Sequence, residues 1–175
     1  EARGRFGGRI KSLTVDGQNF DLGPSWIWQG QHRVAALLGH FNLPVFEQWS
    51  DGTQLYEQAS GDVVQNAGFM SMAGSMRIGG GTSALTDALV QALDPARIFT
   101  NAAVRQIGTG PRAMLENGEI ITAQQIVIAV PPRIAAQMTF EPSLPLAAPS
   151  ALAAIPTWMG AHAKCVAVYP TPFWR

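Results

Sequence analysis

The sequence predicts a mixed α/β fold, and three observations lead to that prediction. Residues 126–130, Ile-Val-Ile-Ala-Val, form an apolar run of the kind found in strands buried on both faces. An antiparallel meander with an Asn-Gly turn comes directly before this run, over residues 98–122. Two segments with helical periodicity, near 31–41 and 83–93, lie between candidate strands. Interspersed strands and helices of this kind are typical of α/β domains.

Length and composition indicate a globular protein. The 175 residues are enough for one domain with a core, and 47% hydrophobic against 14% charged residues argues against disorder. Twelve basic residues balance twelve acidic ones, so charge gives no reason to expect binding to nucleic acid or to an anionic membrane. Such a neutral surface favours self-association, and we expect a homo-oligomer. No apolar run approaches about 20 residues and the start has no signal-peptide core, so we expect a cytoplasmic protein.

The first nine residues, Glu1-Ala2-Arg3-Gly4-Arg5-Phe6-Gly7-Gly8-Arg9, combine three features that suit a nucleotide. A carboxylate at the tip of a strand can accept hydrogen bonds from a ribose, and arginines can bind pyrophosphate as a fork. Glycines let the backbone approach a flat ring closely. In a dinucleotide-binding βαβ unit the ribose-binding acid lies roughly 20 residues after the glycine-rich fingerprint, and Glu1 fits that place.

This opening resembles the E-x-R-x-R-x-G-G-R motif of the flavin-containing amine oxidases, the monoamine and polyamine oxidase group. Phytoene desaturases and protoporphyrinogen oxidases share the motif, so by itself it indicates FAD rather than an amine substrate. The resemblance implies that Glu1-Ala2-Arg3 binds ribose and phosphate, and that Gly7, Gly8 and Arg9 flank the pyrophosphate and the ring. It begins after the family's G-x-G-x-x-G unit, so we expect the 175-residue chain alone to bind FAD weakly and to be inactive.

Residues 10–23 are predicted to form a hairpin that turns at Asp16-Gly17, and residues 31–41 an amphipathic helix. Between them, residues 21–26 resemble the family's D-L-G-G-x-W/Y passage, whose backbone passes beside the flavin. The resemblance therefore implies that Gly23, Ser25 and Trp26 contact the cofactor. Pro24 replaces the second glycine and removes an N–H donor.

Residues 44–57 look like strands with an Asp51-Gly52 turn, and methionines gather after them at Met70, Met72 and Met76. These methionines could line a substrate surface, although filling gaps in a core is their more common role. Larger members of the family have a long helical segment in this region, most of which is absent here.

Three glycines, 79–81, precede a helix that Thr82 or Ser83 can cap and that Asp94-Pro95 ends. A glycine run before a helix can bind phosphate, but a loop that turns the chain is the commoner case. The run resembles the family's G-G-x-x-x-L element, which leads back into the FAD domain.

The meander is predicted to comprise strands at 103–107, 113–115, 120–122 and 126–130, with a turn at Asn117-Gly118. It resembles the family's return to the FAD domain, which implies that the backbone of Val104 meets adenine and that Ala129 lies at the cofactor. Residues 140–149 are expected to cross between domains, and 151–155 to form a short helix.

Lys164 interrupts an apolar segment, 160–169, that alternates as a strand would. A buried ammonium is costly without partners, and a lysine that reaches water from an edge strand is the ordinary explanation. Residues 164–174 also resemble the family's K-C-x-V-x-Y-x-x-P-F-W motif, whose lysine holds a water against the flavin nitrogen that accepts the hydride. The resemblance therefore implies that Lys164 is catalytic. No metal site is expected, because the histidines have no ligand spacing and Cys165 is the single cysteine.

Taken over the whole chain, the resemblance implies part of an FAD/NAD(P)-binding, Rossmann-like domain with a meander, and part of a reduced substrate domain. The expected segments are 1–57 and 78–142 for the FAD domain and 58–77 and 143–175 for the substrate domain. The implied function is FAD-dependent oxidation of a C–N bond in a small-molecule amine, with reoxidation by oxygen. Two alternatives stay open: a C–C desaturase or protoporphyrinogen-type oxidase, and a degenerate, non-enzymatic binding module.

Overall fold

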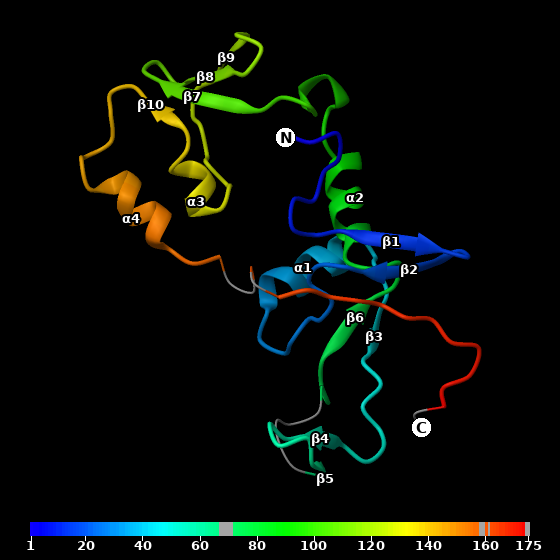
Figure 1. Ribbon diagram of the computed structural model, residues 1–175. Helices are drawn as coiled ribbons and strands as arrows, with labels where there is room; N and C mark the ends of the chain where they lie inside the picture. The colour runs from blue at the N-terminus through cyan, green and yellow to red at the C-terminus, as the bar shows by residue number, and fades with distance from the viewer. Residues whose placement is uncertain (67–71, 158–159, 161, 174–175) are drawn as a thin grey trace. The chain divides into compact units, whose positions relative to one another are not determined.

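The computed structural model describes residues 1–66, 72–157, 160 and 162–173, and it shows a mixed α/β chain (Figure 1). The predictions on Met70 and on Trp174, the last residue of the 164–174 motif, lie outside the described residues. The chain divides into two compact units: the first unit comprises residues 1–6 and 96–163, and the second unit comprises 7–95 and 164–175. These units are a division by compactness, and the predicted assignment to FAD and substrate domains stays a prediction.

The second unit begins with the predicted hairpin. Strands β1 (Ser12–Val15) and β2 (Gln18–Asp21) pair antiparallel, with Ser12 opposite Asp21. The two residues between them, Asp16 and Gly17, have φ of 48° and 75°. Positive φ at both central residues is what a tight hairpin turn requires, and Asp-Gly supplies it at low cost. The prediction of this hairpin is confirmed.

The core of the second unit lies between its two helices, α1 (His32–His40) and α2 (Ser83–Gln91). Ile27, Leu38 and Ile78 are buried together, and partly buried side chains pack against them from Val34, Leu43, Met76, Ala84 and Leu85. Both helices were predicted, and their apolar stripes account for this packing. Met76 therefore fills a core, as expected for most methionines.

Short strand pairs complete the second unit. Strand β3 (Val45–Glu47) pairs with β6 (Met76–Ile78), and β4 (Leu55–Glu57) pairs with β5 (Val63–Gln65). The strands predicted around Asp51-Gly52 therefore exist, but they do not pair with each other. β3 instead pairs with the strand that contributes Ile78 to the core.

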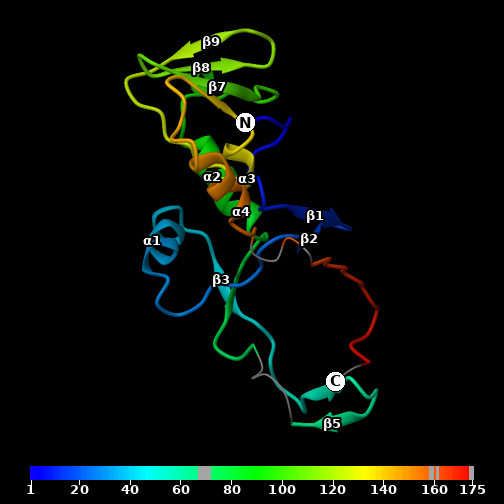
Figure 2. The same cartoon turned by 60° about the vertical axis from the view of Figure 1, so that its left-hand side comes forward.

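The first unit contains a four-stranded sheet in the order β10-β7-β8-β9. Figure 2 shows β7, β8 and β9 of this sheet, and Figure 1 labels β10 beside β7. Its members are β7 (Val104–Gly108), β8 (Arg112–Leu115), β9 (Ile120–Thr122) and β10 (Thr139–Phe140). The predicted Asn117-Gly118 turn joins β8 to β9, and the Asn117 side chain accepts a hydrogen bond from the Glu119 amide at 3.0 Å. β10 was not predicted, and it pairs with β7 in parallel.

Two short helices, α3 (Pro132–Ala135) and α4 (Ala148–Ala154), pack against each other in the first unit. Helix α4 begins three residues before the predicted helix, and α3 was not predicted. A 3-10 turn, η1 (Pro95–Arg97), follows α2 in the chain, which agrees with the predicted helix stop at Asp94-Pro95.

Two predicted strands are wrong. Residues 126–130 are irregular, and Val127 is 87% exposed. Residues 162–169 are likewise irregular and exposed. A strand needs a neighbour for its backbone N–H and C=O groups. No strand in the described part of the chain pairs with either segment.

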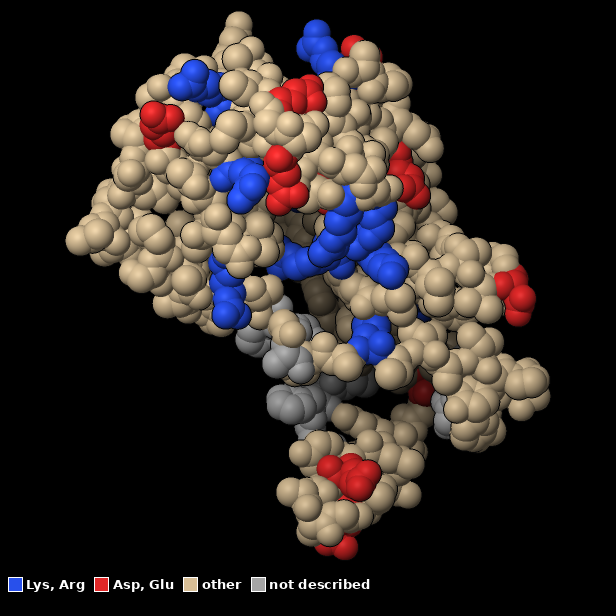
Figure 3. Space-filling model, turned by 45° about the horizontal axis from the view of Figure 1, so that its top comes forward, with Lys and Arg blue, Asp and Glu red and all other residues tan. Residues whose placement is uncertain are grey.

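The face drawn in Figure 3 carries both basic and acidic side chains, and most of it is uncharged. None of the helices in the described residues has the length and apolar character that a membrane crossing requires.

Candidate functional site

The Lys164 ammonium is held by three acceptors at the end of β2 and in the segment that follows it. Its Nζ donates to the backbone oxygen of Gly23 at 2.6 Å, to the Ser25 hydroxyl at 2.6 Å and to the backbone oxygen of Asp21 at 3.2 Å. The Trp26 ring centroid lies 5.2 Å from the same nitrogen, within the range of a cation–π contact. An ammonium has three N–H donors, and here each has an acceptor. We call this arrangement the lysine seat.

The shape of the lysine seat follows from the packing beneath it. Ser25 is 5% exposed and Ile27 9% exposed, whereas Trp26 between them is 41% exposed, which is the alternation of an extended segment. Ile27 exchanges two backbone hydrogen bonds with Met76, both of 2.8 Å. The core therefore fixes the direction in which Ser25 points.

Gly23 lies directly against the end of the opening motif. A Cβ at Gly23 would overlap the carbonyl oxygen of Arg9, so the two stretches of backbone can approach this closely only because Gly23 has no side chain. The predicted site residues Arg9, Gly23, Ser25, Trp26 and Lys164 are thus brought together in the second unit.

Asp21 organises the other side of the same segment. Its carboxylate is almost fully buried, and Oδ1 accepts hydrogen bonds from the Ser12 hydroxyl at 2.7 Å and from the amide and hydroxyl of Thr82, both at 2.8 Å. Oδ2 has no hydrogen-bond partner, and Arg77 Nη2 lies 3.9 Å from it. Asp21 therefore caps α2 from 61 residues away, although the sequence indicated a cap by Thr82 or Ser83.

The three-glycine turn serves this cap. Gly80 and Gly81 both have φ of 82°, and a Cβ on Gly81 would lie 2.8 Å from the Ser12 hydroxyl and 3.0 Å from Asp21 Oδ1. The start of α2 is occupied by the protein's own carboxylate, so an anion cannot bind there without displacing it. The turn-forming interpretation of residues 79–81 is the one that the geometry supports.

The opening motif is shared between the two units. In the second unit, Gly7 and Gly8 have φ of 96° and 54°, and a Cβ on Gly8 would meet nothing within 4 Å. The Gly7 carbonyl accepts a hydrogen bond from the Ile10 amide at 2.8 Å. The glycine pair therefore forms a turn in which Gly7 packs against the Ile10 backbone and Gly8 faces open space, as a flat ligand would need.

In the first unit, Glu1-Ala2-Arg3 runs beside the residues that lead into β7. The backbone oxygen of Glu1 accepts a hydrogen bond from Ala102 at 2.9 Å, and that of Arg3 accepts one from Asn101 at 3.1 Å. The Glu1 carboxylate accepts a hydrogen bond from the Arg3 amide at 3.0 Å. These hydrogen bonds place Glu1, the predicted ribose ligand, beside the residues that lead into Val104, the predicted adenine contact. Ala129 lies in the irregular segment 126–130 and is exposed.

Sequence reasoning missed Asp21, Ser12, Thr82 and Arg77 as a buried polar cluster. The sequence pointed to this cluster only through Asp21 in the 21–26 motif. The partners of Asp21 lie far from it in the chain, so no local pattern connects them. In the described residues, no group of three or more potential ligands could hold a metal ion.

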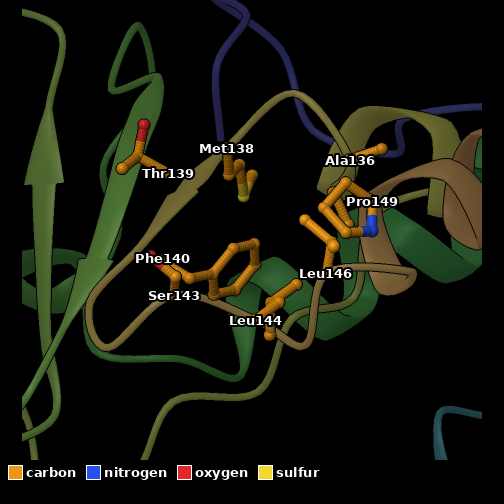
Figure 4. A pocket seen from close by; sticks show the side chains of 9 residues that line it. Ala136, Met138, Thr139, Phe140, Ser143, Leu144, Leu146 and Pro149 are labelled. Atoms are coloured by element: carbon orange, nitrogen blue, oxygen red, sulfur yellow. The ribbon is translucent and has the colours of Figure 1, made fainter.

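A separate hollow of about 280 Å³ lies in the first unit, where Met138, Phe140, Leu144 and Leu146 point toward one another (Figure 4). Its lining is mostly apolar and includes none of the predicted site residues. It therefore adds nothing to the lysine seat.

The residues of the second unit fit a flavin in their chemistry. A fixed ammonium can face an electron-accepting ring nitrogen, and the space beside Gly8 that a Cβ would occupy is empty, so a flat ring could lie there. A mixed α/β chain with a nucleotide-type opening motif and such an ammonium resembles the class of nucleotide-cofactor-dependent oxidoreductases.

The comparison with known proteins narrows this class. The family of flavin containing amine oxidoreductases matches the chain over residues 1–62 and 55–175, and the chain belongs to that family. It is 32% identical over 111 residues to a putrescine oxidase of Kocuria rosea, an alignment that covers 62% of this chain and 23% of that protein. It is 33% identical over 69 residues to the flavin-containing amine oxidase B of Cavia porcellus, covering 38% of this chain and 13% of that protein.

Solved structures show the same fold. A double mutant of putrescine oxidase superposes with a TM-score of 0.75 at 17% identity, covering 87% of this chain and 56% of that one. Cyclohexylamine oxidase from Brevibacterium oxydans IH-35A gives a TM-score of 0.75 at 16% identity, covering 87% and 56%. The chain thus spans about half the length of these structures and a quarter or less of the two curated relatives named above.

Proposed function

We propose that this chain contributes to an FAD-dependent amine oxidase. In the proposed reaction a C–H bond next to an amine nitrogen is broken, the resulting imine is hydrolysed by water, and oxygen takes up the electrons. When bound, the flavin accepts the hydride and is reoxidised by oxygen. The observation that carries the proposal is the lysine seat: an ammonium held by Gly23 and Ser25 in the segment that the family passes beside its flavin.

The residues of the chain would hold the cofactor in named places. Glu1 would bind ribose, Arg3 and Arg9 would flank the pyrophosphate, and the backbone of Val104 would meet adenine. Gly7, Gly8 and Gly23 would let the backbone approach the ring, with Ala2, Ser25, Trp26 and Ala129 beside it. Lys164 would present its positive charge to the ring edge, where it can hold a water. These placements and a cytoplasmic location are parts of the proposal.

Amine oxidation is favoured over the desaturase or protoporphyrinogen-type alternative by the names of the two relatives and by the lysine motif. Both relatives are amine oxidases by name. The substrate class we propose is therefore a small primary or secondary amine, with oxygen as the second reactant.

The test is a visible absorption spectrum of the full-length gene product, followed by anaerobic addition of a panel of amines. We expect flavin bands that bleach with at least one amine and return when oxygen is admitted. Lys164→Met should leave the anaerobic bleaching intact and slow the return by roughly a hundredfold, the scale of losing one positioned electrostatic group. A folded protein without flavin bands would refute the proposal and favour the non-enzymatic binding module.

A further inference from the structure

Among the three acceptors in the lysine seat, Ser25 is the one that acts through its side chain. Asp21 and Gly23 offer backbone oxygens, which every residue has, whereas the Ser25 acceptor is a hydroxyl at 2.6 Å. Ser25 is 5% exposed, so its hydroxyl is largely withdrawn from water. A buried hydroxyl needs partners: the Ser25 O–H donates to the backbone oxygen of Gly23 at 3.5 Å, and its oxygen accepts the much shorter hydrogen bond from Lys164.

We propose that Ser25 is a positioning residue whose buried hydroxyl fixes the direction of the Lys164 ammonium. Two of the ammonium contacts are short, to Gly23 and to Ser25 at 2.6 Å each, and the third, to Asp21, is longer at 3.2 Å. The short pair anchors the nitrogen. The N–H on the longer contact is the one that can turn to a water or a ligand while the anchors stay in place.

Neither the backbone around Lys164 nor the Trp26 ring fixes the direction of the ammonium in place of Ser25. Residues 162–169 are irregular and lack strand pairing, so the backbone of Lys164 does little to aim its side chain. The Trp26 ring, at 5.2 Å, attracts the charge but leaves its orientation free. Removing the Ser25 hydroxyl would therefore leave the ammonium on one short contact, with freedom to swing.

The role of Ser25 in positioning can be measured without any cofactor, because the chain contains its own reference. Lys11 is the other lysine of the sequence and is exposed. Reductive methylation of the 175-residue chain, resolved by peptide mass spectrometry, gives the rate at Lys164 relative to Lys11 in one sample. We expect Lys164 to react at about one tenth of the Lys11 rate, because its nitrogen must leave charge-assisted hydrogen bonds before it can react.

Ser25→Ala should raise the ratio of the two rates about tenfold, which corresponds to about 1.4 kcal/mol. Ser25→Thr keeps a hydroxyl and should restore the low ratio. Ser75→Ala is the matched control: Ser75 is fully buried in the same unit, and its hydroxyl bonds Met72 at 2.7 Å rather than the lysine seat. An unchanged ratio in a Ser25→Ala variant that keeps its circular dichroism spectrum would overturn the proposal, as would an equal rise in Ser75→Ala.

The consequence for catalysis rests on the proposed function and is tested separately. In the full-length gene product, Ser25→Ala should slow reoxidation of the reduced flavin by oxygen about tenfold, the same factor as for the methylation ratio, and leave anaerobic reduction by the amine unchanged. Unchanged reoxidation together with a raised methylation ratio would refute positioning by Ser25 in the reaction. A protein without amine-reducible flavin would refute the proposed function instead, and the methylation ratio would still report on the lysine seat.

Discussion

Replacing Asp21 tests whether one buried carboxylate holds the hairpin, the α2 helix and the lysine seat together. Asp21→Ala removes the acceptor for the Thr82 amide and the Ser12 hydroxyl, at 2.8 and 2.7 Å, and leaves the first donor buried and the second partly buried. The Thr82 hydroxyl keeps a second acceptor, the Pro24 carbonyl at 3.1 Å. Two unsatisfied donors at about 1–3 kcal/mol each give an expected loss of roughly 2–6 kcal/mol of unfolding free energy.

Asp21→Asn separates hydrogen bonding from charge. The amide oxygen can still accept at the Oδ1 position, but the charge opposite Arg77 Nη2, 3.9 Å from Oδ2, is gone. Hydrogen bonds to charged groups contribute about 1 kcal/mol more than neutral ones, so we expect a loss of roughly 1–2 kcal/mol. Asp87, exposed on the same helix, is the control, and Asp87→Ala should change stability by no more than about 0.5 kcal/mol.

The assay is urea unfolding of the 175-residue chain, followed by circular dichroism with the slope compared between variants. In thermal unfolding the same losses should lower the melting temperature by about 4–24 °C for the alanine variant, at roughly 2–4 °C for each kcal/mol. A loss below about 1 kcal/mol in Asp21→Ala, at equal slope, would show that the cluster does not stabilise the fold.

Two further pairs of variants test the turn before α2 and the core beneath the site. Gly80→Ala and Gly81→Ala meet the same φ of 82°, which costs about 1–2 kcal/mol, but only the second places a Cβ within 3.0 Å of buried polar oxygens. Gly81→Ala should therefore be the less stable in urea unfolding, and equal stabilities would contradict the geometry. Leu38→Ala should cost about 2–5 kcal/mol of unfolding free energy because Leu38 is 5% exposed. Leu37→Ala should cost far less because its neighbour Leu37 is 37% exposed. The urea midpoints of the two variants check this difference.

The parts of the fold that were predictable are those set by local chemistry. The Asp16-Gly17 turn has positive φ at both residues, and the Asn117-Gly118 turn has it at Gly118. The α1 and α2 helices follow from the spacing of their apolar residues. The segments 126–130 and 162–169 were mistaken for strands because their composition suits a sheet, and composition does not provide a pairing partner.

The candidate site was only partly predictable for the same reason. Lys164 and the 21–26 segment could each be singled out by resemblance, but their contact spans 139 residues between Ser25 and Lys164. The Asp21 cap on α2 spans 61 residues, so the local capping signals at Thr82 and Ser83 pointed to the wrong group. Long-range polar contacts of this kind leave no periodic pattern along the chain.

Asp21 links the stability of the fold to the geometry of the lysine seat because its side chain and its backbone oxygen have different partners. Its carboxylate binds the start of α2, and its backbone oxygen accepts the longest of the three hydrogen bonds from Lys164. The Thr82 hydroxyl shares its O–H between Asp21 Oδ1 at 2.8 Å and the backbone oxygen of Pro24 at 3.1 Å, so it also connects α2 to residue 24. Pro24 thus accepts a hydrogen bond through its carbonyl, although it lacks the N–H donor of the glycine that the family has at this position. The segment 21–26 is therefore held by the start of α2 and by the core around Ile27, and its Ser25 and Trp26 side chains contact the Lys164 ammonium.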